Sequence, residues 1–168
     1  MKAEHVNAFL APSVEVLRKM ARTAVAVGRV SRLQRTLAPN ALSIIIGLNG
    51  SLSGSVILTA GREVAWALAG RIVREELSEE AEGEVMAVLS ELANTIVGNA
   101  TGHLYELGHT EGITPPTVVM GARVSFDFSE GVESVLIPLE TDAGEIDLIV
   151  SLARPFPGAA ELCGPRGR

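Results

Sequence analysis

A carboxylate and an amide, Glu91 and Asn94, lie three residues apart in a stretch that has no proline between residues 79 and 107. Apolar residues recur there at spacings of three and four, which predicts one long helix that stops at Gly108. Side chains three positions apart on a helix project side by side. The pair would therefore present a negative charge and a neutral hydrogen-bonding group to whatever approaches the helix.

The two faces of this helix differ in kind. At 100° per residue, one stripe is apolar and predicts the core: Val85, Leu89, Leu92, Ile96, Ala100, Leu104 and Leu107. The opposite face carries small and polar residues: Glu84, Ala87, Glu91, Asn94, Gly98, Thr101, Gly102 and Tyr105. An exposed glycine inside a helix costs about 1 kcal/mol relative to alanine. Two of them beside Glu91 and Asn94 indicate that another backbone or protein comes close.

A simpler interpretation stays open at this point. The chain has 17 Glu and 5 Asn among 168 residues, so about half an E-x-x-N match is expected by chance, and a bare motif is weak. A second match does occur at Glu4 and Asn7, where no small-residue platform follows, and we interpret it as coincidence. Glycines on a helix face also often pack against a neighbouring element of the same chain.

Other residues offer less chemistry. None of the three histidines, His5, His103 and His109, has a metal-ligand partner at a suitable spacing, so the prediction is no metal site. His103 falls on the apolar stripe and is expected in the core, and Asn99 is expected to bond locally at the core edge. The sequence gives no ground for a Ser-His-Asp or Cys-His arrangement. The single cysteine, Cys163, lies near the end of the chain.

Composition narrows the class of protein. A chain of 168 residues fits one domain, and a formal net charge of −6 argues against a nucleic-acid binder, which needs a basic stripe. Hydrophobic residues make up 47%, which predicts a large core or a subunit interface. No secretory signal and no run long enough to span a bilayer is visible. We therefore expect a cytoplasmic protein without membrane insertion.

The remaining elements predict a mixed α/β (α+β) single domain, in which a hairpin-rich sheet surrounds two central helices and an N-terminal helix is added. The helix over 3–22 contains Pro12, which suggests a kink or a restart capped by Ser13. Asn49-Gly50 is a strong hairpin signal, and Pro138 requires a sheet edge or a bulge. The other predicted elements are strands 23–30, 41–49, 51–59, 118–120, 123–128, 132–139 and 145–152, helix 62–74, and a turn at Asp142-Ala-Gly144.

The chain resembles the CheX-like chemotaxis phosphatases, relatives of CheC and FliY. The long helix carries ELANTIVGNA, which matches the family's E-x-x-N motif with a glycine four residues after the asparagine. The resemblance extends to AEHVNAFLAPSVEVLRKM, IIIGLNGSLSGSVIL and ITPPTVVMG, and it covers roughly residues 3–152. It implies a phosphatase domain over 1–154, followed by a Pro/Gly-rich tail over 155–168 that we expect to be disordered.

The resemblance also implies a substrate, the aspartyl phosphate of a CheY-type receiver domain. Asn94 would place the attacking water and Glu91 would pair with the receiver's active-site lysine. Glu84, Ala87, Gly98 and Thr101 would line the docking surface. The protein would need no cofactor of its own, because Mg²⁺ would belong to the receiver, and it is expected to form a homodimer.

Two departures from the family pattern bear on these expectations. The helix over 62–74 has no E-x-x-N, as in single-site members of the family, and the position four before Glu91 is Ala87, where some relatives carry a polar residue. The alternative is a non-catalytic CheX-like binding or scaffold module that sequesters a receiver or a flagellar switch component.

Overall fold

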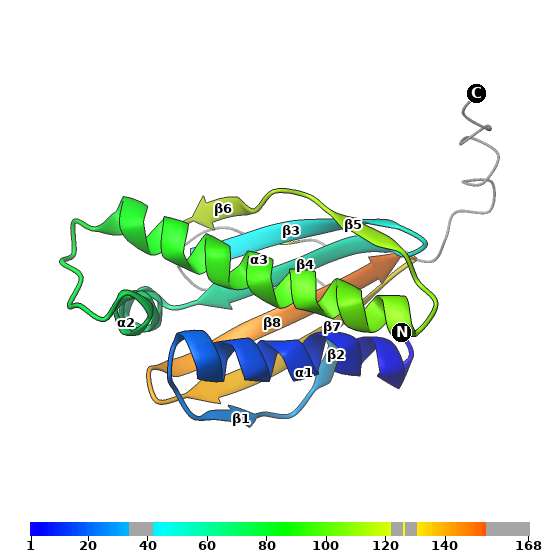
Figure 1. Ribbon diagram of the computed structural model, residues 1–168, viewed down its shortest axis with the longest axis horizontal. Coiled ribbons are helices and arrows are strands. Elements are labelled where there is room, and N and C mark those ends of the chain that lie inside the picture. Colours follow the sequence, from blue (N-terminus) through cyan, green and yellow to red (C-terminus); the bar gives the residue numbers. More distant parts are fainter. Residues whose placement is uncertain (34–41, 122–125, 127–130, 154–168) are drawn as a thin grey trace.

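The computed structural model describes residues 1–33, 42–121, 126 and 131–153. Three helices lie on one face of a twisted antiparallel sheet (Figure 1). The helices are α1 (Ala3–Met20), α2 (Arg62–Val73) and α3 (Glu82–Glu106). The strands are β1 (Val25–Val27), β2 (Ser31–Leu33), β3 (Leu42–Gly50), β4 (Ser53–Ala60), β5 (Glu111–Ile113), β6 (Thr117–Met120), β7 (Val132–Thr141) and β8 (Gly144–Ala153). This confirms the predicted mixed α/β class.

The sheet is built from hairpins, as predicted. Its described strands follow the order β1-β7-β8-β4-β3-β5, with β2 pairing to β7 and β6 pairing to β3. Every pairing is antiparallel. The β7–β8 hairpin closes at Asp142-Ala143, because Thr141 is opposite Gly144, and Gly144 takes the positive φ that this turn needs. The predicted strand over 123–128 lies almost wholly outside the described residues, as does the tail.

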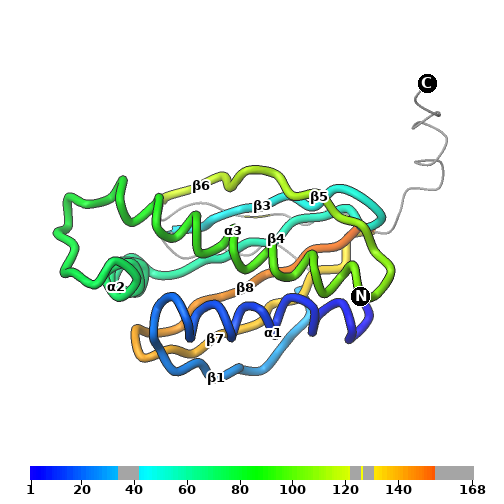
Figure 2. Tube along the Cα trace, in the orientation of Figure 1, coloured from blue at the N-terminus to red at the C-terminus, as the bar shows by residue number. Residues whose placement is uncertain are grey.

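Two helices cover the middle of the sheet. Figure 2 shows α1 and α3 crossing it next to each other, and the two are in contact. The core lies between α3 and the central strands, where Ile96 and Val97 pack against Ile44, Val56 and Leu148. No helix in the described part of the chain is long and apolar enough to cross a membrane.

Pro138 shows how a proline fits inside a sheet. It lies on β7, which is flanked by β8 on one side and by β1 and β2 on the other. The pairing on that second side is interrupted over residues 28–30, between β1 and β2. Gly28 donates its N–H to the Pro138 carbonyl at 2.9 Å. A proline has no N–H to give to a ladder, so Pro138 lies at this break in the pairing, where the sequence predicted an edge or a bulge.

Two local predictions were wrong. Helix α1 runs through Pro12 without a restart, and Ser13 is no cap: its hydroxyl donates to the Phe9 carbonyl at 2.7 Å. Burial of Phe9 and Leu17 favours the continuous helix despite the lost hydrogen bond. The strand predicted over 23–30 is only the short β1, and the sequence analysis missed β2.

The β3–β4 hairpin forms, but its turn is not at Asn49-Gly50. Those two residues stay extended, because they pair with Gly112 and Glu111 of β5. The chain reverses at Ser51 and Leu52 instead, and the Glu111 carboxylate accepts hydrogen bonds from the Ser51 hydroxyl at 2.9 Å and the Leu52 N–H at 2.7 Å. A distant strand therefore moved a turn that local propensity had placed two residues earlier.

Candidate functional site

Helix α3 is the element that positions the candidate site. It starts with the acidic residues Glu82 and Glu84, which suit the positive end of a helix dipole. It ends in a Schellman motif, in which Gly108 donates to the Tyr105 carbonyl at 2.9 Å and His109 donates to the Leu104 carbonyl at 2.9 Å. Gly108 has a φ of 86°, so the predicted glycine stop is confirmed.

The inner side of α3 anchors the helix. Most of the predicted core stripe is buried: Val85, Leu89, Leu92, Ile96, Ala100 and Leu104. Leu107 is the exception, because it follows the last helical residue and is 41% exposed. This anchoring holds the opposite side of the helix at the surface with little freedom to turn.

The outer side, here called the site face, holds the residues singled out from the sequence: Glu84, Ala87, Glu91, Asn94, Gly98, Thr101, Gly102 and Tyr105. Glu84, Ala87 and Glu91 are exposed, while Asn94, Gly98 and Thr101 are half-buried. All the residues predicted for catalysis and docking therefore share one accessible face of one helix.

The polar ends of the Glu91 and Asn94 side chains make no polar interaction with the described part of the chain. Within the described part of the chain, neither the Glu91 carboxylate nor the Asn94 amide has a hydrogen-bond or ion-pair partner. By contrast, the Thr95 hydroxyl donates to the Glu91 carbonyl at 2.8 Å, and the Thr101 hydroxyl donates to the Gly98 carbonyl at 2.7 Å. The two threonine hydroxyls therefore bond within the helix, whereas the polar ends of Glu91 and Asn94 do not.

The two glycines of the site face have no packing role inside the chain. A methyl group added to Gly98 or to Gly102 would meet nothing within 4 Å. This removes the alternative that these glycines make room for a neighbouring element. Their surroundings instead leave the helix backbone open to a partner.

The predicted positions of His103 and Asn99 were wrong. His103 and Asn99 are both exposed, so neither belongs to the core or its edge. His5 is buried, and its Nε2 lies 3.2 Å from Nε2 of His109. Burial, followed by the nearby His109, lowers the pKa of His5. Among the described residues, no group of three His, Cys, Asp or Glu side chains is placed to hold a metal ion.

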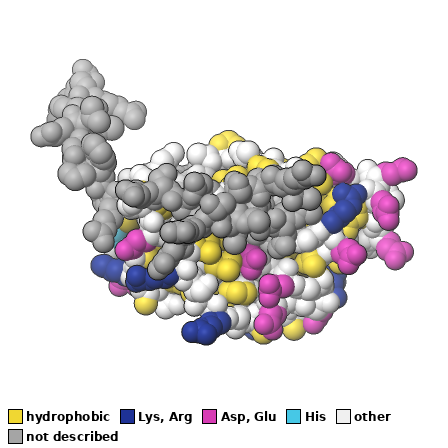
Figure 3. All heavy atoms as spheres, turned by 180° about the vertical axis from the view of Figure 1, so that it is seen from behind, with side chains coloured by type: hydrophobic (Ala, Val, Ile, Leu, Met, Phe, Trp, Pro, Cys, Tyr) yellow, Lys and Arg dark blue, Asp and Glu magenta, His cyan; other side chains and the backbone are white. Residues whose placement is uncertain are grey.

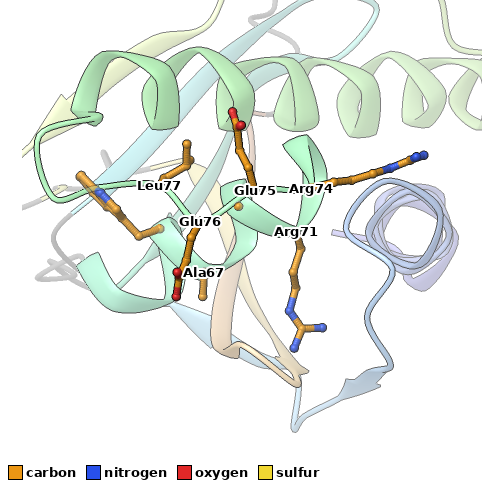
Figure 4. Close-up of a pocket in the computed structure, with 8 residues that line it drawn as sticks. Ala67, Arg71, Arg74, Glu75, Glu76 and Leu77 are labelled. Atoms are coloured by element: carbon orange, nitrogen blue, oxygen red, sulfur yellow. The ribbon is translucent and has the colours of Figure 1, made fainter.

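A hollow lies at α2 (Figure 4), lined by Trp66, Ala67, Gly70, Arg71, Arg74, Glu75, Glu76 and Leu77. It carries both signs of charge, and some of its side chains are already committed: Trp66 donates to the Ser78 carbonyl at 2.9 Å, and Arg71 pairs with Asp142 at 3.4 Å. The sequence of helix α2 contains no Glu/Asn pair of the E-x-x-N type.

Acidic side chains gather at the end of the molecule where α2 leads into α3 (Figure 3). Several glutamates of this end are exposed: Glu75, Glu76, Glu79, Glu80, Glu82 and Glu84. Only Glu84 belongs to the site face, and the others lie in the exposed segment that joins α2 to the start of α3.

Comparison with known proteins places this chain in a family. The sequence model for "Chemotaxis phosphatase CheX" matches residues 42–140. A CheY-P phosphatase CheX of Thermotoga maritima is 31% identical over 125 residues, 72% of this chain and 78% of the relative.

Solved structures agree on the fold. The CheX–CheY–BeF3–Mg²⁺ complex of Borrelia burgdorferi matches with a TM-score of 0.76 and 27% identity, over 89% of this chain and 97% of that chain. A CheC-like superfamily protein from Shewanella sp. PV-4 gives a TM-score of 0.82 at 24% identity, over 90% and 99% of the two chains. The family model matches more than half of this chain, and the Thermotoga maritima relative is 31% identical over 72% of it. The chain therefore belongs to the CheX family of chemotaxis phosphatases.

Proposed function

We propose that this protein hydrolyses the aspartyl phosphate of a CheY-type receiver domain, with Glu91 and Asn94 as the acting residues. The observation that carries the proposal is the state of this pair, which lies uncommitted on an open helix face between small residues. The relatives named CheY-P phosphatase and CheX–CheY complex supply the substrate class.

The chemistry requires little from the phosphatase itself. An aspartyl phosphate is a reactive acyl phosphate with a carboxylate leaving group, so catalysis depends mainly on placing water in line with the bond that breaks. The water oxygen bonds to phosphorus, the bond from phosphorus to the aspartyl oxygen breaks, and inorganic phosphate and a free carboxylate result. The proton lost by the water passes to the phosphate or to solvent.

Each residue of the pair has one task. The Asn94 amide orients the water without bringing a further negative charge near the phosphoryl oxygens. The Glu91 carboxylate pairs with a lysine of the receiver and holds the two proteins in register. Mg²⁺ belongs to the receiver and supplies positive charge at the phosphoryl group when bound. Orientation of this kind contributes on the order of 10²-fold to the rate.

We assign the docking surface for the receiver to the same site face of α3. Ala87 and Gly98 keep the surroundings of the pair low, so that the helix can enter the receiver's cleft, while Glu84 and Thr101 flank it. The domain over 1–154, the cytoplasmic location and the homodimer stay predictions, and light scattering at micromolar concentration would test the last of them.

The deciding experiment measures inorganic phosphate release from a purified CheY-type receiver that is fed by a small-molecule phosphodonor, with one tenth as much of this protein added. We expect acceleration with the wild type and its loss with Asn94→Ala. Asn99→Ala is the matched control, because Asn99 is an exposed asparagine of the same helix outside the site face.

The outcomes separate the two candidate functions. Acceleration that survives Asn94→Ala would refute the assigned role of Asn94. Binding to the receiver without any acceleration at this ratio would show the sequestering module instead, since such a protein acts stoichiometrically and cannot turn over.

A further inference from the structure

Tyr105 is the most exposed large hydrophobic side chain among the described residues, at 72%. Within the described ranges, its hydroxyl has no hydrogen-bond partner and its ring makes no aromatic or cation–π contact. Nothing inside the chain accounts for placing a tyrosine here. Tyr105 lies on the site face identified from the sequence, but no role was predicted for it.

Helical geometry relates Tyr105 to the catalytic pair. It follows Asn94 by eleven residues, so its side chain points within about 20° of the same direction, roughly 16 Å further along the axis. Between them the surface is low: Gly98 and Gly102 face open space, and the Thr101 hydroxyl is turned back onto the Gly98 carbonyl. The residues of the site face between Asn94 and Tyr105 are Gly98, Thr101 and Gly102, so none of them carries a long side chain.

We propose that Tyr105 is a docking residue for the receiver domain and sets the affinity for it; this inference rests on the proposed function. Glu91 and Asn94 span less than one helical turn, whereas a standard protein interface buries about 800 Å² per partner. The site face from Glu84 to Tyr105 is about 31 Å long. A disc of about 800 Å² centred on Asn94 has a radius of about 16 Å, so an interface of this size reaches Tyr105.

The chemistry of tyrosine suits the assignment. Tyrosine is enriched among the residues that dominate binding energy, because its ring buries a large area at a low entropic cost. At about 16 Å from Asn94, the ring does not reach the reacting atoms. Its contribution should therefore appear in the binding of the receiver and not in the chemical step.

The test measures phosphate release as a function of receiver concentration for the wild type, Tyr105→Ala, Tyr105→Phe and Asn94→Ala. We expect Tyr105→Ala to raise KM about tenfold with kcat within about twofold of the wild type, and Tyr105→Phe to stay near the wild type. Asn94→Ala should lower kcat. Leu107→Ala is the control, because it removes another exposed apolar side chain at the same helix end, which points to a different side.

Direct titration of the receiver, carrying BeF3 and Mg²⁺, separates this inference from the proposed function. Suppose that the wild type binds without accelerating phosphate release and that Tyr105→Ala binds about tenfold more weakly. This result would refute the proposed phosphatase activity and support the docking role of Tyr105. An unchanged KM and affinity in Tyr105→Ala, a loss confined to kcat, or an equal loss in Leu107→Ala would overturn the docking role. Absence of any binding by the wild type would overturn both proposals.

Discussion

Helices α2 and α3 both carry glycine on a surface side, yet for different reasons. A methyl group added to Gly70 of α2 would lie 2.8 Å from the Glu75 carbonyl oxygen, whereas one added to Gly98 or Gly102 of α3 would meet nothing. The glycine of α2 is needed by the chain's own backbone, which folds back there. The glycines of α3 are not, and the proposed docking of a receiver on this face would account for them.

The ends of the two helices extend this comparison. The chain leaves α3 through Gly108, at a φ of 86°, but leaves α2 through Arg74, at a φ of 68°. A residue with a side chain pays roughly 1–2 kcal/mol for the left-handed conformation. Arg74 is held by its N–H bond to the Gly70 carbonyl at 2.7 Å. A glycine in the sequence therefore indicates function only when its surroundings offer no structural explanation.

The largest expected effect comes from filling the site face. Gly98→Leu should reduce receiver dephosphorylation by about 10²-fold, the share assigned to orientation, because the added side chain keeps the receiver away from Asn94. Folding should not suffer, since the position is open and leucine favours a helix. Phosphate release and thermal unfolding measured on the same preparation check both statements.

Ala67→Leu is the matched control for that variant. Ala67 is an exposed small residue of α2, and adding the same bulk there should leave dephosphorylation unchanged. Equal losses of dephosphorylation in the two variants would mean that Gly98 and Gly102 of α3 have no special role.

A smaller effect, opposite in sign for the two helices, is expected for alanine. Gly102→Ala should raise the free energy of unfolding by about 1 kcal/mol, because alanine favours the helix and meets no neighbour. Gly70→Ala should lower it by about 1–3 kcal/mol, because the methyl group is forced against backbone at Glu75. Urea denaturation decides the signs, and stabilisation by both substitutions would erase the contrast between the helices.

The smallest expected effect is a pH dependence of stability, which arises where His5 of α1 lies against His109, just after α3. Burial and then His109 lower the pKa of His5 below its ordinary value of about 6.5. The unfolded chain therefore binds more protons in the window from pH 6.5 down to the lowered pKa, and stability should fall as the pH drops through it.

Urea denaturation at pH 7.5 and pH 5.5 tests this pH dependence. The loss of stability between the two pH values should be smaller in His5→Gln, which keeps a polar group opposite His109. An identical loss in the two proteins would assign the acid sensitivity to other groups.

Regular periodicity made much of the fold predictable. The long helix, its glycine stop, helix 62–74 and the β7–β8 hairpin are all present, because local spacing and turn chemistry agree with the packing there. The turn after β3 was misplaced because pairing of Asn49 and Gly50 with β5 outweighs their preference for a tight turn. No local signal in residues 49–50 reports a strand that lies sixty residues further on.

His103 shows that a helical projection does not by itself predict which side of a long helix is buried. Counted at 100° per residue, it points in the same direction as Val85, yet Val85 is buried and His103 is exposed. In the second half of α3 the buried side shifts to Val97, Ala100 and Leu104, a rotation of about 80°. The helix crosses a twisted sheet and packs on α1, so its covered side changes along its length.

The sequence by itself determined that Glu91 and Asn94 share one helix face with small residues around them, because helical spacing alone decides which side chains are neighbours. Only the tertiary structure decided that this face is open, that Gly98 and Gly102 pack against nothing, and that Tyr105 lies bare at its far end. The physical reason is that exposure depends on what the sheet and α1 cover. That in turn depends on sheet twist and long-range pairing, which no local pattern contains.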